Sequence, residues 1–202
     1  MTEALPAPAL STTNITPSVI VVRFARSAER NPLSIATLNE LDALLTPLLN
    51  NEAIETVIFT GTDDVFLSGA NIRELAQLDT DSARSFARFG QRLFQSIANA
   101  RQKTIAAING YCMGGGMDLA LACDTRAASI DAKFGHPGAR LGIITGWGGT
   151  QRLPRLIGKA RALELFATAR LFTATEALAL GLIDAVGDPV VQLAIDLARS
   201  AR

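Results

Sequence analysis

A run of three glycines, Gly114, Gly115 and Gly116, separates a strand-like apolar segment at residues 104–108 from a helix-like segment at residues 117–121. Glycines at such a junction permit a tight turn, and the first N–H groups of the helix lack acceptors, so negative charge is favoured there. A second glycine turn, at residues 66–75, also follows a predicted strand and enters a predicted helix. The chain must therefore fold so that strands lead repeatedly into helices.

The rest of the chain shows the same alternation. Val19–Phe24 and Thr56–Thr60 are short β-branched runs that predict buried strands. Between them, Ser34 caps a predicted helix with leucines at helical spacing, which Pro47 should end or bend. Asp81 is expected to cap a long helix that reaches residue 100. Later segments predict a strand at residues 125–130 and helices at residues 147–157, 160–169 and 174–180. This order indicates an α/β fold.

Composition excludes several classes of protein. The 202 residues are 49% hydrophobic and 19% charged, which is typical of one domain with a sizeable core. Lys and Arg number 19, as do Asp and Glu, and no basic block favours nucleic acid. No apolar run reaches the roughly 20 residues that span a bilayer, so no membrane is expected. Cys112 and Cys123 lack metal-ligand spacing and form no disulfide framework, which favours a reducing, cytoplasmic location and no metal.

The first 18 residues are rich in Pro, Ala and Thr and lack the features of a signal peptide. We therefore expect residues 1–18 to form a flexible tail and residues 19–202 to form the domain.

The two glycine turns alone are also compatible with merely tight turns, and a nucleotide-phosphate loop is disfavoured because neither G-x-G-x-x-G nor the Lys-containing P-loop pattern is present. Together, however, the segments resemble the crotonase (enoyl-CoA hydratase/isomerase) family over residues 19–186. The resemblance lies in residues 31–34, 66–75, 109–124, 134–137, 148–154 and 177–186. It implies a crotonase-like (ClpP/crotonase) α/β fold, a spiral of ββα units with flanking helices.

The resemblance also implies a function and a partner. In that family, the positions of Ala70 and Gly115 supply two backbone N–H groups that form an oxyanion hole. The implied partner is an acyl-CoA thioester, whose carbonyl oxygen gains negative charge as an enolate forms. CoA would then be part of the substrate, and no separate cofactor is implied.

The family pattern further implies contacts with CoA. Ser68, Ala70 and Ile72 would border the adenine and pantetheine path, and Arg73 would approach the phosphates. Other candidates for phosphate contacts are Arg23, Arg26 and Arg30. A solvated surface role is the alternative for each arginine.

The sequence departs from a typical hydratase of the family at one of its two catalytic glutamates. The matching positions are Asp118 and Gly138, so the second carboxylate is missing and simple hydration should be weakened. Asp118 lies one helical turn after Gly115, where it could exchange a proton with the acyl chain or merely favour the helix dipole. His136, the single histidine, could replace the missing group or be structural.

Two other functions are compatible with the residues. Cys112 and His136 could act as nucleophile and base of a thioester hydrolase, by analogy with the Clp-type serine peptidases, which resemble crotonases in fold. A small buried cysteine is the alternative for Cys112. The chain could also be a non-catalytic acyl-CoA-binding or assembly protein.

The resemblance implies self-association as a homotrimer or a dimer of trimers. Crotonases usually continue with further helices beyond the position of Val186, whereas about one helix remains here. The sequence is therefore expected to be a short variant or a truncated chain.

Overall fold

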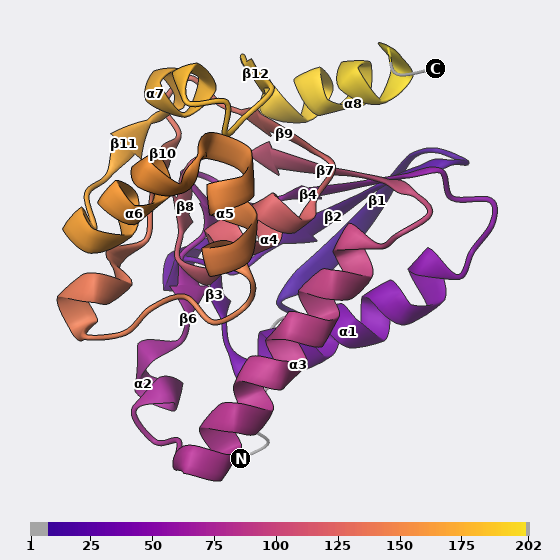
Figure 1. Ribbon diagram of the computed structural model, residues 1–202. Coiled ribbons are helices and arrows are strands. Elements are labelled where there is room, and N and C mark those ends of the chain that lie inside the picture. The colour runs from indigo at the N-terminus through magenta and orange to yellow at the C-terminus, as the bar shows by residue number, and fades with distance from the viewer. Residues whose placement is uncertain (1–7, 201–202) are drawn as a thin grey trace.

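The computed structural model describes residues 8–200, which are built around a twisted six-stranded sheet (Figure 1). The strand order is β1-β2-β4-β7-β9-β12, and all neighbours are parallel except β1 and β2. The bounds are β1 Leu10–Thr16, β2 Val19–Phe24, β4 Thr56–Thr60, β7 Lys103–Ile108, β9 Thr125–Ala128 and β12 Ala185–Val186.

A smaller sheet contains the strands that follow β4, β7 and β9 along the chain, in the same spatial order. Its order is β11-β10-β8-β5, and a separate pair joins β3 to β6. Along the chain, β4 is followed by β5, β7 by β8, and β9 by β10, and each pair then leads into helices. The predicted spiral of ββα units is confirmed by this order. The bounds are β3 Pro32–Leu33, β5 Val65–Leu67, β6 Gly69–Ala70, β8 Tyr111–Met113, β10 Lys133–Gly135 and β11 Phe172–Thr173.

The helices begin at identifiable caps. Ser34 caps α1 by accepting a hydrogen bond from the backbone N–H of Thr37 at 3.1 Å, as predicted. The helix continues past Pro47 to Leu49, so the proline does not end it. Asp79, and not Asp81, caps α3, because its carboxylate accepts from the N–H of Ser82 at 2.8 Å in a capping box. The bounds are α1 Ile35–Leu49, α2 Ile72–Leu75, α3 Thr80–Ala98, α4 Gly115–Ala122, α5 Gly149–Ile157, α6 Lys159–Thr168, α7 Ala174–Ala179 and α8 Val190–Ser200, with 3₁₀ turns η1 Ser27–Glu29 and η2 Pro137–Leu141. Across residues 8–200, every helix is too short or too polar to cross a membrane.

Both faces of the large sheet are covered. In β4, Val57 and Phe59 join the main core with α1, α3 and α4, whereas Ile58 joins a smaller core beneath α8. Successive side chains of a strand point to opposite faces, so an uninterrupted apolar run of this kind suits a strand covered on both sides. Figure 1 shows α8, in yellow, on the side of the sheet away from α1 and α3.

The prediction of a flexible tail is wrong for the part that the structure describes. Leu10–Thr16 forms β1 and pairs antiparallel with β2. The carboxylate of Glu40 on α1 also accepts hydrogen bonds from the N–H groups of Ala9 and Leu10, at 3.0 and 2.9 Å. This segment is ordered because its backbone groups find partners on β2 and α1. Residues 1–7 lie outside the described residues.

A buried arginine ties the last strand to the sheet. The side chain of Arg126 donates to the carbonyl oxygens of Leu182 at 2.7 Å and of Cys123 at 2.6 Å. It also pairs with Asp184 at 3.4 Å. These contacts hold the connection between α7 and β12 against the end of α4.

Candidate functional site

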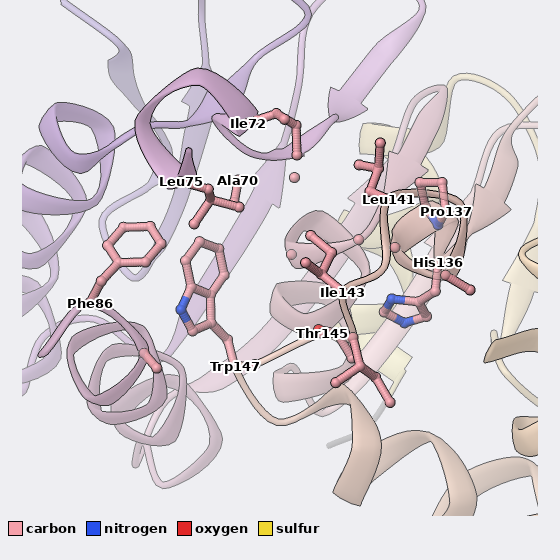
Figure 2. A pocket seen from close by; sticks show the side chains of 18 of the residues that line it. Ala70, Ile72, Leu75, Phe86, His136, Pro137, Leu141, Ile143, Thr145 and Trp147 are labelled. Atoms are coloured by element: carbon pink, nitrogen blue, oxygen red, sulfur yellow. The ribbon is translucent and has the colours of Figure 1, made fainter. Parts of the chain in front are cut away.

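A cavity of about 370 Å³ opens where the two glycine turns meet (Figure 2). One wall comes from β6, α2 and the first half of α3, and the other comes from η2 and the segment that follows it. Most of the lining side chains are apolar: Ile72, Leu75, Leu78, Phe86, Leu141, Ile143, Ile144, Trp147 and Phe166 among them. The cavity therefore suits a ligand with a substantial hydrocarbon portion.

The two glycine turns lie in contact at the base of this cavity. A Cβ atom on Gly69 would lie 3.1 Å from the backbone nitrogen of Gly115, and Gly69 has a φ of +95°. Only glycine fits this close approach without strain. Ala70 and Gly115 both line the cavity, and Gly115 is the first residue of α4, so its N–H has no acceptor within the helix. Tertiary structure thus brings together the two residues that sequence analysis selected.

Trp147 forms much of the wall beside Gly115, and sequence analysis did not select it. Its indole packs so closely against Gly90 of α3 and Gly115 of α4 that a Cβ atom on either glycine would collide with the ring. Phe86 and Phe94 contact it edge-on, with centroid distances of 5.2 and 5.6 Å. Figure 2 shows the indole between Phe86 on one side and Ile143 and His136 on the other. A glycine in the middle of a helix was the available signal, since helices disfavour glycine unless something packs there.

Asp118 is completely buried behind the cavity wall. Its Oδ2 atom accepts hydrogen bonds from the Thr145 hydroxyl and, at 3.1 Å, from the Trp147 N–H. Gly149 packs against the carboxylate so closely that a Cβ atom there would collide with Oδ1. Burial raises the pKa of Asp118 to about 6, although the hydrogen bond from Thr145 opposes this shift. Asp118 is not one of the residues that line the cavity, whereas Thr145 and Trp147, which hold its carboxylate, are.

His136 lies between this carboxylate and the cavity. It lines the cavity although its side chain is only 4% exposed, and its ring packs on Phe166 at a centroid distance of 5.0 Å. Its Nε2 atom is 3.8 Å from Oδ1 of Asp118, and both atoms are buried without a hydrogen-bond partner. Burial lowers the pKa of His136 to about 4, so the imidazole is neutral at neutral pH.

Cys112 is not placed to serve as a nucleophile. It is a fully buried residue of β8 and is not one of the residues that line the cavity with His136. Burial raises the pKa of its thiol well above the usual range, so the reactive thiolate is disfavoured. This geometry argues against the nucleophile and base hypothesis.

Gly138, where a carboxylate was expected in a typical hydratase of the family, is packed closely by its neighbours. Its carbonyl oxygen accepts from the Ile143 N–H at 3.0 Å. A Cβ atom on Gly138 would lie 2.7 Å from the Ile143 carbonyl oxygen. A larger residue at this position therefore requires the segment after η2 to move.

The residues expected to contact CoA divide into two groups. Ser68, Ala70 and Ile72 line the cavity, and Arg73 is exposed beside them on α2. Arg26 precedes η1, in the segment that leads to β3, and β3 pairs with β6. Ser68, Ala70 and Ile72 therefore border the cavity, whereas Arg73 and Arg26 are not among the residues that line it.

The other two arginines have structural partners. Arg23 donates to the Gly61 carbonyl oxygen at 2.8 Å. Arg30 forms an ion pair with Asp64 at 3.0 Å and lies over the Tyr111 ring. Within residues 8–200, no group of three or more His, Cys, Asp or Glu residues could hold a metal ion.

Comparison with known proteins places this architecture in a family. The family model described as enoyl-CoA hydratase/isomerase matches residues 14–201. The chain is 40% identical over 172 residues to a short-chain-enoyl-CoA hydratase of Clostridium acetobutylicum, covering 85% of this chain and 66% of that protein. It is 41% identical over 170 residues to a crotonyl-CoA hydratase of Syntrophomonas wolfei, covering 84% of this chain and 65% of that protein. The chain thus spans about two thirds of the length of these relatives.

A solved enoyl-CoA hydratase from Bacillus anthracis superposes with a TM-score of 0.90 at 37% identity, covering 95% of this chain and 76% of that one. The chain therefore belongs to the enoyl-CoA hydratase/isomerase family and has the α/β crotonase fold.

Proposed function

We propose that this family member binds an acyl-CoA thioester in the cavity and stabilises its enolate with the N–H groups of Ala70 and Gly115. The observation that carries the proposal is the contact between the two glycine turns, which brings both residues to one cavity. A thioester carbonyl becomes more negative as the α-carbon loses a proton, so donors fixed in advance favour the transition state over the ground state. Loss of one such donor typically costs about 3–4 kcal/mol.

The cavity wall suits the rest of the ligand. Ser68 and Ile72 would border the pantetheine and adenine, and Arg73 and Arg26 would approach the phosphates. The apolar lining supports an acyl group at the base of the cavity, beside Trp147.

The two named relatives above are hydratases, and a lyase reaction of this kind is the first activity to test. Hydration adds a hydroxyl group to the β-carbon and a proton to the α-carbon. It therefore needs one group that activates the water and one that delivers the proton. Because Gly138 offers no carboxylate, we expect slower hydration of a simple enoyl-CoA than in a protein with two glutamates. Proton transfer between carbon atoms needs one such group and is the second reaction to test.

The oxyanion assignment is tested with a pair of variants at Gly115. Proline fits the first position of a helix but has no N–H, so Gly115→Pro removes the proposed donor. Gly115→Ala is the matched control, because it brings the same steric conflict with Trp147 but keeps the N–H. We expect kcat/KM for crotonyl-CoA to be about 10²–10³-fold lower in Gly115→Pro than in Gly115→Ala. Equal values would contradict the role of this N–H.

The rival function is a non-catalytic acyl-CoA-binding or assembly protein. Incubation with enoyl-, hydroxyacyl- and malonyl-type CoA thioesters, followed by mass spectrometry, distinguishes the two. A product supports the enzyme, binding without any product supports the rival, and a lack of binding overturns the proposal. Self-association as a trimer or a dimer of trimers stays a prediction, which light scattering over a range of concentrations would check.

A further inference from the structure

Two buried polar atoms near the cavity face each other without hydrogen bonds. They are Nε2 of His136 and Oδ1 of Asp118, which are 3.8 Å apart. This separation exceeds that of an N–H···O hydrogen bond by about 1 Å. Native proteins leave few buried polar atoms unpaired, and those that remain often belong to sites that act on a ligand.

The surroundings of Asp118 hold its carboxylate in place behind the residues that line the cavity. Its other oxygen is held by the Thr145 hydroxyl and the Trp147 N–H, which belong to the cavity wall itself. Gly149 packs against Oδ1, and its backbone N–H favours the ionised carboxylate. Among the residues that line the cavity, His136 brings an unpaired polar atom to within 3.8 Å of this carboxylate.

We propose that His136 is the catalytic residue that transfers the proton at the acyl α-carbon, and that Asp118 is a positioning residue that holds its imidazole through Nε2. This inference rests on the proposed function, since it requires an acyl-CoA thioester in the cavity. It assigns the proton-transfer role to a residue of the cavity wall instead of to the buried carboxylate that stands at the family's glutamate position.

The proton transfer balances without any additional reactant. In this step Nε2 carries the ring proton and faces the Asp118 carboxylate, which leaves the lone pair of Nδ1 free to accept a proton. The α-carbon C–H bond breaks, its electron pair moves into the enolate, and the proton forms a bond with Nδ1. The resulting imidazolium faces the Asp118 carboxylate, and the enolate oxygen faces the N–H groups of Ala70 and Gly115. Return of a proton from Nδ1 to the same carbon restores the thioester.

Other charged groups around the pair act mainly on Asp118. The nearby Arg152 guanidinium favours the ionised carboxylate and so opposes the rise in its pKa. Asp118 in turn raises the pKa of Cys112. His136 faces the Phe166 ring on its other side, and burial is what lowers its pKa. Above about pH 6 the carboxylate is ionised and the imidazole is neutral, which is the state that the proton transfer requires.

The first test observes the pair directly, because the sequence contains one histidine. Nitrogen-15 NMR of the histidine-labelled protein reports the tautomer of His136 and its titration without any assignment. We expect the Nε2–H tautomer in the wild type. In Asp118→Asn, we expect a switch to the Nδ1–H tautomer and a lower pKa of His136, because the carboxylate no longer stabilises the imidazolium. An Nδ1–H tautomer in the wild type, or the same titration in both proteins, would overturn the pairing.

The second test follows exchange of the α-protons of butyryl-CoA in D₂O by mass spectrometry, with binding measured separately by calorimetry. We expect His136→Gln and Asp118→Asn each to slow exchange by about 10²–10⁴-fold, with butyryl-CoA still bound. The double variant should be no slower than His136→Gln, because the two residues act as one unit. Asp131→Asn is the matched control, since this aspartate is exposed and should exchange at the wild-type rate.

The outcomes separate this inference from the proposed function. If His136→Gln exchanges α-protons at nearly the wild-type rate, Asp118 acts without His136 and the inference is wrong. The same conclusion follows if the rate reductions of the two single variants multiply in the double variant. If the wild type binds butyryl-CoA but exchanges no α-proton, the inference fails while acyl-CoA binding stands. If the wild type does not bind the thioester, the proposed function itself fails.

Discussion

Gly90→Ala tests the packing that shapes the cavity, because the expected sign of its effect opposes helix propensity. Gly90 lies inside α3, where alanine normally stabilises a helix by about 0.5–1 kcal/mol relative to glycine. Here, however, a Cβ atom would collide with the Trp147 indole, which also packs closely against Gly115. The ring is also in contact with Phe86 and Phe94, so it has little freedom to move aside.

The magnitude follows from these opposing terms. Overpacking a filled core typically costs about 1–3 kcal/mol, which exceeds the gain of about 0.5–1 kcal/mol from propensity. We therefore expect Gly90→Ala to lower the free energy of unfolding by about 0.5–2 kcal/mol. In a Trp147→Ala background the collision is gone, so the same change should raise that free energy by about 0.5–1 kcal/mol.

Urea unfolding of the four proteins, followed by far-ultraviolet circular dichroism, gives the complete cycle. If Gly90→Ala lowers the free energy of unfolding of the wild type and raises that of Trp147→Ala, the indole lies against α3. Stabilisation of the wild type by Gly90→Ala would refute the reasoning, because the indole could not then occupy the space beside Gly90.

Three further predictions concern the cavity, the buried pair and the last strand. Trp147→Ala should lower the free energy of unfolding by about 3–5 kcal/mol. In binding assays, it should also let acyl-CoA thioesters with longer chains compete better with butyryl-CoA, since we expect the indole to limit the space for the acyl group. Burial raises the pKa of Asp118 from 3.8 to about 6 and lowers that of His136 from 6.5 to about 4. His136→Gln should therefore lose stability as the pH rises from about 4 to 6, because the folded state holds the Asp118 proton more tightly than the unfolded state does. Asp118→Asn should gain stability as the pH rises from about 4 to 6.5, because the folded state disfavours protonated His136. Urea midpoints across this range check both signs, and equal slopes for the two variants would contradict them. Arg126→Met should lower the free energy of unfolding by at least about 1–3 kcal/mol, because it leaves buried carbonyl oxygens without a donor. Arg170→Met should lower it by about 1 kcal/mol or less, because the ion pairs of Arg170 are exposed. Thermal unfolding would show the difference.

The segments that sequence analysis predicted well are those with strong local signals. Val19–Phe24 and Thr56–Thr60 are strands with the predicted bounds, because short runs rich in β-branched and apolar residues suit strands of a sheet that is covered on both faces. Ser34 caps α1 because a serine hydroxyl can accept the N–H of Thr37 within the same turn. The glycine turns were visible in the sequence, and the resemblance to the family supplied the choice of Ala70 and Gly115 within them.

Other features depend on contacts between distant segments. The Thr-rich segment Leu10–Thr16 is a strand because β2 and Glu40 supply its hydrogen-bond partners. Position 79 and position 81 both hold aspartate, and only the turn that precedes α3 decides that Asp79 is the cap.

The sequence by itself determined the alternation of the main strands and helices and the two glycine turns, because these follow from residue type and spacing along the chain. The family was recognised by the resemblance of several ordered segments. Tertiary structure alone decided that Asp118 faces His136, that Trp147 fills the space between Gly90 and Gly115, and that Ile143 closes on Gly138. The physical reason is that the direction of a side chain depends on the volume and hydrogen bonds offered by residues far away in the sequence, and a packed interior accepts few alternative arrangements.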